Sequence, residues 1–169
     1  VVEEAHKRCI EVHAWINPYR VTNFQNYKLD ENHIYFKKPH LFKTYGGRIY
    51  FDPGLEETGD YLIRVLQDIV SRYDIDAIHF DDYFYPNDTS YSGTNTELKG
   101  YTYSFEPYVD MADYKAYLSK GGNLNIYDWR RSNVDALIKN LSDMIREINT
   151  TRERPCVFGI SPCGRWAPS

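Results

Sequence analysis

The sequence predicts an α/β fold in which short parallel strands alternate with long helices. Three stretches alternate apolar and polar residues as half-buried strands do, and two longer stretches between them have helical periodicity. Links from helix to strand are short, whereas links from strand to helix are long and rich in tyrosine. Long loops at the C-terminal ends of parallel strands build the active site of a (β/α)8 barrel. Such a barrel needs roughly 250 residues, so we expect residues 1–169 to form one domain, the central portion of a larger barrel.

The first strand is expected at residues 10–17, after a charged segment that suits the end of a helix. The apolar side chains on one face are Ile10, Val12, Ala14 and Ile16. The other face carries His13, Trp15 and Asn17. Pro18 ends the strand because proline has no amide hydrogen to donate. The segment that ends in Arg20 is therefore expected at the C-terminal end of the strand, with these polar side chains clustered there.

A long irregular segment follows, from residue 21 to about residue 54, and loops of this length in compact domains are usually functional. It contains two turn signals and one short expected strand, at Gly46-Gly47, Asp52-Pro53-Gly54 and residues 48–51. The clearest helix is expected at residues 56–73, with Thr58 as its N-cap. Its apolar residues at helical spacing are Leu62, Val65, Leu66, Ile69, Val70 and Tyr73.

The second strand begins the most informative segment of the chain, residues 74–86. Alternation places Ile78 and Phe80 on a face toward helices. The opposite face carries Ala77, His79 and Asp81. A carboxylate at the C-terminal end of a strand is where α/β folds keep their chemistry. Asp81 is therefore the leading candidate for a catalytic group, with His79 below it on the same face.

Another long polar and aromatic loop spans residues 83–127, with a short helix expected at residues 111–118. Asp128 is expected to cap a second long helix at residues 129–149. Its apolar stripe is Val134, Leu137, Ile138, Leu141, Ile145 and Ile148. The third strand is expected at residues 156–161, with Phe158 and Ile160 on one face. The other face carries Val157, Gly159 and Ser161.

Composition excludes several classes of function. The net charge is −4, whereas a nucleic-acid partner favours a basic patch, so we expect none. No cofactor or metal site is expected, because no strand is followed by a glycine-rich phosphate loop and the five histidines lack metal-ligand spacing. No stretch is long and apolar enough to span a membrane. The three cysteines, Cys9, Cys156 and Cys163, are expected to be free and mostly buried thiols.

Four motifs along the chain resemble those of one bacterial family, glycosyl-hydrolase-like family ten, long catalogued as a domain of unknown function. They are His13-Ala-Trp-Ile-Asn-Pro-Tyr-Arg20, Asp76-Ala-Ile-His-Phe-Asp-Asp-Tyr-Phe-Tyr-Pro86, Asp128-Trp-Arg-Arg-Ser-Asn-Val134 and Phe158-Gly-Ile-Ser-Pro-Cys-Gly-Arg-Trp166. Ala77 stands where the family usually has Gly, and Cys163 where Phe is more usual. The resemblance implies a TIM barrel distantly similar to the α-amylase superfamily. It also implies hydrolysis of glycosidic bonds in bacterial cell-wall or other extracellular polysaccharides, and hence an extracytoplasmic location.

Glycoside hydrolysis usually needs two carboxyl groups that flank the bond. Asp81 falls where the amylase-like strand carries its nucleophile, and we favour that role over the alternative of a structural carboxylate that orders neighbouring loops. Asp82 is also a candidate catalytic residue. It points to the other face if the strand continues, so the structural alternatives are that it positions Asp81, fixes the following turn or binds a cation with loop oxygens. The second carboxyl group is either Glu106 or a residue beyond Ser169, and we favour the latter.

The expected substrate-binding residues lie near the strand ends, and each has a structural alternative. Besides His13, Trp15, Asn17 and His79, they are Arg20, Tyr83, Tyr85, Ser161 and Trp166. Arg20 either clamps an acidic sugar or pairs with a nearby carboxylate. The 16 tyrosines either stack on sugar rings or fill the core. Ser161 lacks a visible His–acid pair in the sequence, so serine-nucleophile chemistry is not expected.

Two rival functions and one structural expectation remain open. Since the third strand carries no carboxylate, the barrel could bind a glycan without cleaving it. Asp81 and Asp82 could instead hold a divalent ion in a metal-assisted hydrolase. A partial barrel also has open sheet edges. We therefore expect the chain to pair with another copy, to cover its edges with loops, or to be a piece of a longer protein.

Overall fold

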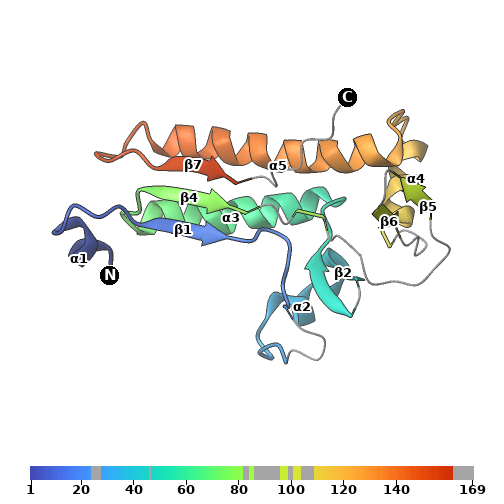
Figure 1. The fold of residues 1–169 in the computed structure, drawn as a ribbon, viewed down its shortest axis with the longest axis horizontal. Coiled ribbons are helices and arrows are strands. Elements are labelled where there is room, and N and C mark those ends of the chain that lie inside the picture. The colour runs from blue at the N-terminus through green and yellow to red at the C-terminus, as the bar shows by residue number, and fades with distance from the viewer. Residues whose placement is uncertain are drawn as a thin grey trace. The chain divides into compact units, whose positions relative to one another are not determined.

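The computed structural model describes residues 1–23, 28–45, 47–81, 84–85, 96–98, 101–103 and 109–161 (Figure 1). Two compact units are present. Unit 1 comprises Val1–Pro18, Asp60–Phe84 and Asp135–Ser169, and unit 2 comprises Tyr19–Gly59 and Tyr85–Val134. Within the described ranges, no helix has the length and apolar character needed to cross a membrane.

Unit 1 is built on a parallel sheet of three strands. These are β1 (His13–Ile16), β4 (Ala77–Phe80) and β7 (Val157–Ile160), in the order β1-β4-β7. The short helix α1 (Val2–His6) precedes β1. Each predicted strand is thus confirmed, two to four residues shorter than expected, because pairing ends where the neighbouring strands end.

The two long helices lie on the same face of this sheet. Helix α3 (Glu56–Arg72) leads into β4, and α5 (Ile126–Ile148) leads into β7. Figure 1 shows both helices behind the sheet, with β1 in blue, β4 in green and β7 in red. A doubly wound sheet has helices on both faces, whereas consecutive units of a barrel have them on one. The arrangement confirms the predicted fold class, a partial (β/α)8 barrel with parallel strands.

The core of unit 1 lies between the sheet and these helices. Ile78 and Phe80 are fully buried, as their alternation predicted. The buried helical residues are Leu62, Leu66 and Val70 of α3 and Leu137, Leu141, Met144 and Ile145 of α5. Each large apolar side chain buried here stabilises the fold by about 1.5–3 kcal/mol. Val65 and Tyr73 are exposed instead, because they lie outside the i, i+4, i+8 line of the buried α3 residues.

Both predicted N-caps were wrong. Helix α3 begins at Glu56, so Thr58 lies inside its first turn, where its side chain is buried and its hydroxyl has no hydrogen bond within the described residues. Helix α5 begins at Ile126, two residues before Asp128. Its cap is Asn125, whose Oδ1 accepts hydrogen bonds from the backbone N–H groups of residues 127 and 128, both at 3.0 Å.

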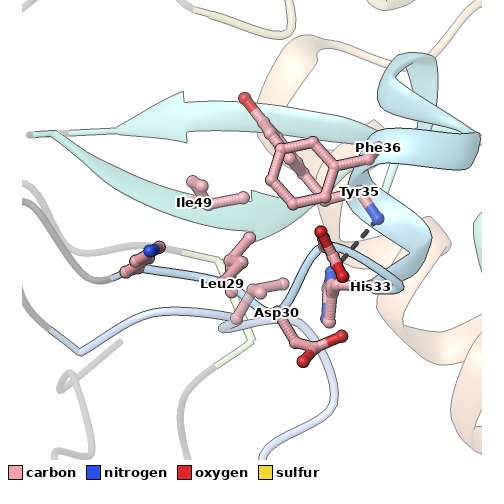
Figure 2. A pocket seen from close by; sticks show the side chains of 9 residues that line it. Leu29, Asp30, His33, Tyr35, Phe36 and Ile49 are labelled. Atoms are coloured by element: carbon pink, nitrogen blue, oxygen red, sulfur yellow. Dashed lines mark hydrogen bonds between the residues drawn. The ribbon is translucent and has the colours of Figure 1, made fainter.

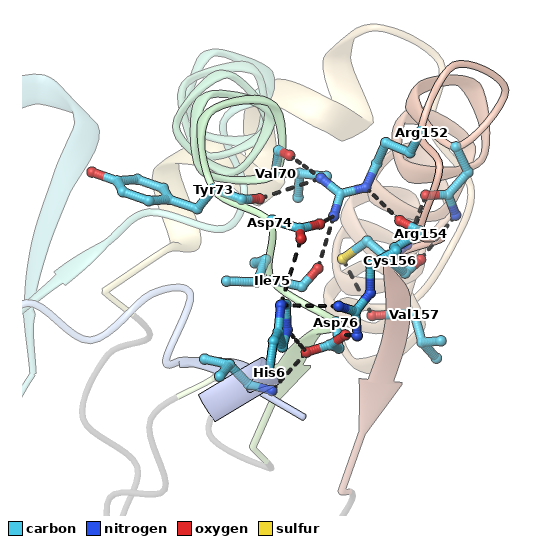
Figure 3. Close-up of polar contacts among 12 residues, drawn as sticks. His6, Val70, Tyr73, Asp74, Ile75, Asp76, Arg152, Arg154, Cys156 and Val157 are labelled. Carbon is cyan, nitrogen blue, oxygen red and sulfur yellow. Dashed lines mark hydrogen bonds and ion pairs between the residues drawn. The ribbon is translucent and has the colours of Figure 1, made fainter. Parts of the chain in front are cut away.

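A polar network joins the N-terminal ends of the strands (Figure 3). One carboxylate oxygen of Asp76 accepts the backbone N–H of Val12 at 2.8 Å and lies 2.8 Å from Nε2 of His6. The other oxygen accepts a hydrogen bond from Arg154 at 3.1 Å. The Val12 amide and His6 hold the pKa of Asp76 below its usual value. Arg152 donates to carbonyl groups in the last turn of α3 and in the link to β4, including that of Ile75 in the link at 2.9 Å. The strand starts are therefore fixed at the end opposite to the candidate site.

Unit 2 contains most of the two long loops, and it is more regular than the sequence suggested. Its elements are α2 (Ile34–Lys37), the 3-10 helix η1 (Pro39–Leu41), β2 (Phe42–Tyr45), β3 (Arg48–Phe51), β5 (Thr96–Leu98), β6 (Tyr101–Tyr103) and α4 (Met111–Ser119). The predicted strand at 48–51 and the predicted short helix are confirmed. Strands β2 and β3 form an antiparallel hairpin, as do β5 and β6, and neither hairpin was predicted.

A charged cluster in unit 2 joins the β2–β3 hairpin to α4. Nζ of Lys43 lies 3.2 Å from Oδ2 of Asp52 and 2.8 Å from Oδ2 of Asp113. The Asp52 side chain is fully buried, and burial raises its pKa. Neither Oδ2 atom has a well-aligned hydrogen bond within the described residues. Coulombic attraction to Lys43 therefore offsets the burial of both carboxylates, and Asp52 gains a hydrogen bond from the backbone N–H of Gly54 to its Oδ1 at 2.9 Å.

The two described cysteines are free thiols, one exposed and one buried. Cys9 is exposed, against the expectation of burial, and Cys156 is buried. Burial raises the pKa of the Cys156 thiol. Cys163 lies outside the described residues.

Candidate active site

The candidate active site is built where the three parallel strands of unit 1 end. Strand register pairs Trp15 with His79 and His79 with Gly159. Two residues further along each strand, alternation brings Asn17, Asp81 and Ser161 to the same face. This face is the one opposite α3 and α5, since Ile78 and Phe80, which alternate with these residues, are fully buried in the core between the sheet and the helices. The inward side chains thus form two layers, one at the strand ends and one below.

Asp81 and Asn17 form the central contact of the upper layer. The Asn17 Nδ2 group donates to Oδ2 of Asp81 at 3.2 Å and lies 3.4 Å from Oδ1. Asp81 is buried, with 9% of its surface exposed. The two residues are adjacent because β1 and β4 are paired up to Ile16 and Phe80, one residue before each. A carboxylate held in this way keeps a fixed direction at the strand ends.

Ser161 and His79 form a second pair that sequence reasoning missed. Ser161 Oγ lies 3.1 Å from Nε2 of His79, and the Ser161 amide donates to the Phe80 carbonyl at 3.0 Å. The sequence suggested no histidine partner for Ser161, because partners on neighbouring strands are set by register. No carboxylate within the described residues orients the other ring nitrogen of His79. The pair therefore lacks the third member of a nucleophile–base–acid triad.

Trp15 and His13 share the inward face of β1 at lower positions. Trp15 lies in the layer of His79 and keeps 69% of its surface exposed. His13 is the first residue of β1 and lies 3.2 Å from a carboxylate oxygen of Glu11. Four residues of strand separate His13 from Asn17, roughly 13 Å. His13 is therefore not part of the cluster at the strand end, although it shares its face.

Arg20 and Tyr85 belong to unit 2. The backbone of Arg20 forms an antiparallel bridge with Tyr50 of β3. The Tyr85 hydroxyl accepts a hydrogen bond from Asn133 at 3.1 Å, and Arg130 lies over its ring at 5.6 Å from the centroid. Burial raises the pKa of this hydroxyl. These contacts match the packing alternative for Tyr85.

Arg130 itself is held by a buried carboxylate. Its guanidinium donates two hydrogen bonds to the carboxylate of Asp110, at 2.7 and 2.6 Å, and Asp110 is fully buried. The bidentate pair fixes the start of α4 against α5. Sequence reasoning missed it because Asp110 lies in a segment without periodicity, 20 positions before Arg130 of α5.

Four predicted site residues lie outside the described residues: Asp82, Tyr83, Glu106 and Trp166. Among the side chains that the structure does describe, no group of three or more His, Cys, Asp or Glu residues could hold a metal ion.

The chain matches a family model over its whole length, and curated relatives match it over nearly its whole length. The family model described as Glycosyl hydrolase-like 10 matches residues 1–169. Glycosyl hydrolase YngK of Bacillus subtilis (strain 168) is 39% identical over 169 residues, which cover 98% of this chain and 29% of the relative. Glycosyl hydrolase DigH of Escherichia coli (strain K12) is 34% identical over 177 residues, which cover 98% of this chain and 35% of the relative. The chain thus spans about a third of the length of these relatives.

Solved structures give weaker likenesses. Alpha-L-fucosidase isoenzyme 2 from Paenibacillus thiaminolyticus matches with a TM-score of 0.49 and 18% identity, covering 94% of this chain and 21% of that one. The alpha-galactosidase from Lactobacillus brevis matches with a TM-score of 0.46 and 12% identity, covering 94% of this chain and 17% of that one. At these TM-scores the fold assignment continues to rest on the strand order and helix placement. The family model and the curated relatives agree, and the chain belongs to the Glycosyl hydrolase-like 10 family.

Proposed function

We propose that this chain forms part of the catalytic barrel of a glycoside hydrolase. The observation that carries the proposal is the buried carboxylate of Asp81, which follows β4 directly and is held by Asn17 after β1. Parallel-strand barrels place their catalytic groups at this end of the strands. Family membership and two relatives named as glycosyl hydrolases support this reaction class. In the intact protein, the substrate would be a bacterial cell-wall or other extracellular polysaccharide.

In this proposal Asp81 stabilises the positive charge that develops on the sugar, or attacks the anomeric carbon as a nucleophile. A second carboxyl group, Glu106 or one beyond residue 169, donates a proton to the leaving oxygen. A separation of about 5–5.5 Å between the two groups would give retention of configuration, and about 6.5–9.5 Å inversion. His79 and Trp15, one layer below, would line the floor of the site.

The test replaces Asp81 by Asn in the intact protein. We expect the rate of glycan hydrolysis to fall by ~10²-fold or more, because the carboxylate charge acts mainly in the transition state. Asp135→Asn is the matched control, since Asp135 lies on the exposed side of α5, and its rate should equal that of the wild type. Circular dichroism establishes that both variants fold. An unchanged rate in folded Asp81→Asn would overturn the proposal.

Azide separates the two roles of Asp81. In Asp81→Ala, a small anion can enter the space of the lost carboxylate and attack the sugar. Azide should then restore turnover and give a glycosyl azide if Asp81 is a nucleophile. If Asp81 only stabilises charge, no glycosyl azide forms.

One observation favours a second candidate, a barrel that binds glycan without cleaving it. The inward positions of β7 are occupied by Val157 and Gly159, and Ser161 follows the strand on the same face, so this strand offers no acid next to Asp81. Under this alternative the intact protein would bind polysaccharide and release no reducing ends during a long incubation. Either function suits an extracytoplasmic location, which cell fractionation of the intact protein would test.

A further inference from the structure

A hollow of about 1000 Å3 opens in unit 2 between the loop at residues 28–33, α2 and β3. Its lining residues include Leu29, Asp30, His33, Tyr35, Phe36 and Ile49, none of which belongs to the candidate active site. Figure 2 shows the rings of Tyr35 and Phe36 on the α2 side and the side chains of Leu29 and Asp30 on the loop side. The hollow therefore combines aromatic, apolar and charged surfaces.

The aromatic wall of the hollow is anchored in the core of unit 2. The rings of Phe51 and Phe42, both nearly buried, lie 4.4 Å apart between centroids. The Phe42 ring contacts Tyr35 edge-on at 5.3 Å, and Tyr35 contacts Phe36 edge-on at 5.3 Å. Phe36 ends this series and keeps 56% of its surface exposed. A ring held in place yet open to solvent can stack on a ligand with little loss of conformational entropy.

The polar side of the hollow is also fixed by local hydrogen bonds. Oδ1 of Asp30 accepts the Asn32 N–H at 2.8 Å, and the Asp30 carbonyl accepts the His33 N–H at 2.9 Å. Nδ1 of His33 accepts the Tyr35 N–H at 3.1 Å. Because Nδ1 accepts this hydrogen bond, a hydrogen on Nε2 leaves that nitrogen of the His33 ring as a donor. The lining of the hollow thus combines a carboxylate and an imidazole with aromatic rings.

The charges of the lining select against anionic ligands. Asp30 and Glu31 contribute two carboxylates, and Lys28 is the single cation among the described lining residues. A phosphate or a uronic acid would meet net repulsion, and the described part of the lining includes no arginine to clamp it. A neutral sugar offers hydroxyl groups that donate to carboxylates, and an apolar ring face that packs on Phe36.

We propose that this hollow is an accessory site for a neutral sugar unit of a glycan chain, built from none of the residues at the strand ends. This inference rests on the proposed function in its choice of ligand class. Such a site would hold a polymer to the protein. Its removal should weaken the binding of glycan chains.

The experiment uses the intact protein carrying Asp81→Asn, so that no probe is consumed. Affinity electrophoresis measures binding to neutral polymers of glucose, galactose, mannose and N-acetylglucosamine, and to polygalacturonate as the anionic comparison. We expect at least one neutral polymer to bind, with Phe36→Ala and Asp30→Ala each weakening it by about fivefold. Phe36→Tyr should retain affinity because it keeps the ring. Lys37→Ala, an exposed change on the same helix, is the matched control and should have no effect.

Three results would overturn the accessory site: no binding to any neutral polymer, equal binding by folded Phe36→Ala, or dependence on the hollow for polygalacturonate only. The outcome is independent of the Asp81 test. Unchanged binding in Phe36→Ala together with lost hydrolysis in Asp81→Asn leaves the active-site proposal standing alone. Weakened binding in Phe36→Ala together with intact hydrolysis in Asp81→Asn leaves the accessory site alone.

Discussion

Asn17 is the residue through which β1 acts on the candidate active site. Its side-chain amide contacts both carboxylate oxygens of Asp81 at 3.2 and 3.4 Å. In Asn17→Ala this contact is lost while Asp81 keeps its charge. A hydrogen bond to a charged group contributes about 1.5–3 kcal/mol, so kcat should fall by about 10- to 100-fold. The KM should stay near the wild-type value, because Asn17 acts on the orientation of Asp81.

Steady-state kinetics of the intact protein checks this prediction. Asn17→Ser, which keeps a donor at a shorter reach, should recover part of the lost kcat. A purely structural role would instead lower the melting temperature and leave kcat of the folded enzyme unchanged, which would contradict the prediction.

At the residue scale, alternation alone predicted which side chains of a strand share a face. Asp81 and His79 were assigned to the inward face, and Asn17 to the same face of the first strand. Alternation does not reveal which residues of two strands lie opposite each other, because register depends on pairing over the whole sheet. The contacts of Asn17 with Asp81, and of Ser161 with His79, therefore could not be derived before the structure.

At the element scale, Lys43 connects the β2–β3 hairpin to α4. Lys43→Met removes the cation that compensates the negative charges of two carboxylates, one of them fully buried. Removing one partner of a buried ion pair costs 3–5 kcal/mol, and partial exposure of Lys43 reduces this to about 2–3 kcal/mol at neutral pH. Chemical denaturation, with the free energy of unfolding as the readout, measures the loss.

The free energy of unfolding that is lost in Lys43→Met should become smaller as the pH is lowered. Burial raises the pKa of Asp52, and Lys43 opposes that rise, so without Lys43 the folded-state pKa is raised further. The pKa of an aspartate in the unfolded chain is about 3.9. When the pKa in the folded state is higher than this, the folded state loses stability as the pH rises above about 3.9. The variant should thus be closest to wild type near pH 4 and furthest from it above pH 7. Adding Asp52→Asn to Lys43→Met should recover part of the stability; a pH-independent loss would contradict the ion-pair account.

Elements with a strong period were predictable, and elements defined by pairing were not. Helices α3 and α5 and the three parallel strands follow from apolar spacing over their own residues. The β2 strand, Phe42–Tyr45, has no clear alternation and exists because β3 pairs with it. The misplaced caps have a related cause. Thr58 and Asp128 are residue types that suit both the cap and the first turn, and only helix geometry distinguishes the two.

At the scale of the whole molecule, the parallel sheet has two edges with unused hydrogen-bonding groups. Within the described residues, β1 and β7 each pair with β4 on one side only. The inward face next to these edges is apolar and exposed at Trp15 (69%) and Val157 (63%). Open edges beside apolar surface are templates for further pairing. We therefore predict that a protein consisting of residues 1–169 alone self-associates in solution.

Sedimentation velocity over a hundredfold range of concentration tests this prediction, with growth of the mean sedimentation coefficient as the expected result. Val157→Lys should reduce the association, because an inward-pointing charge at an edge strand disfavours pairing. Lys139→Ala, on the exposed surface of α5, is the control and should associate like the wild type. A folded monomer at every concentration would show that these edges are already protected within the chain. The long loops would then be the first candidates for that cover, since they are the part of the chain that the strand pattern does not assign to the sheet.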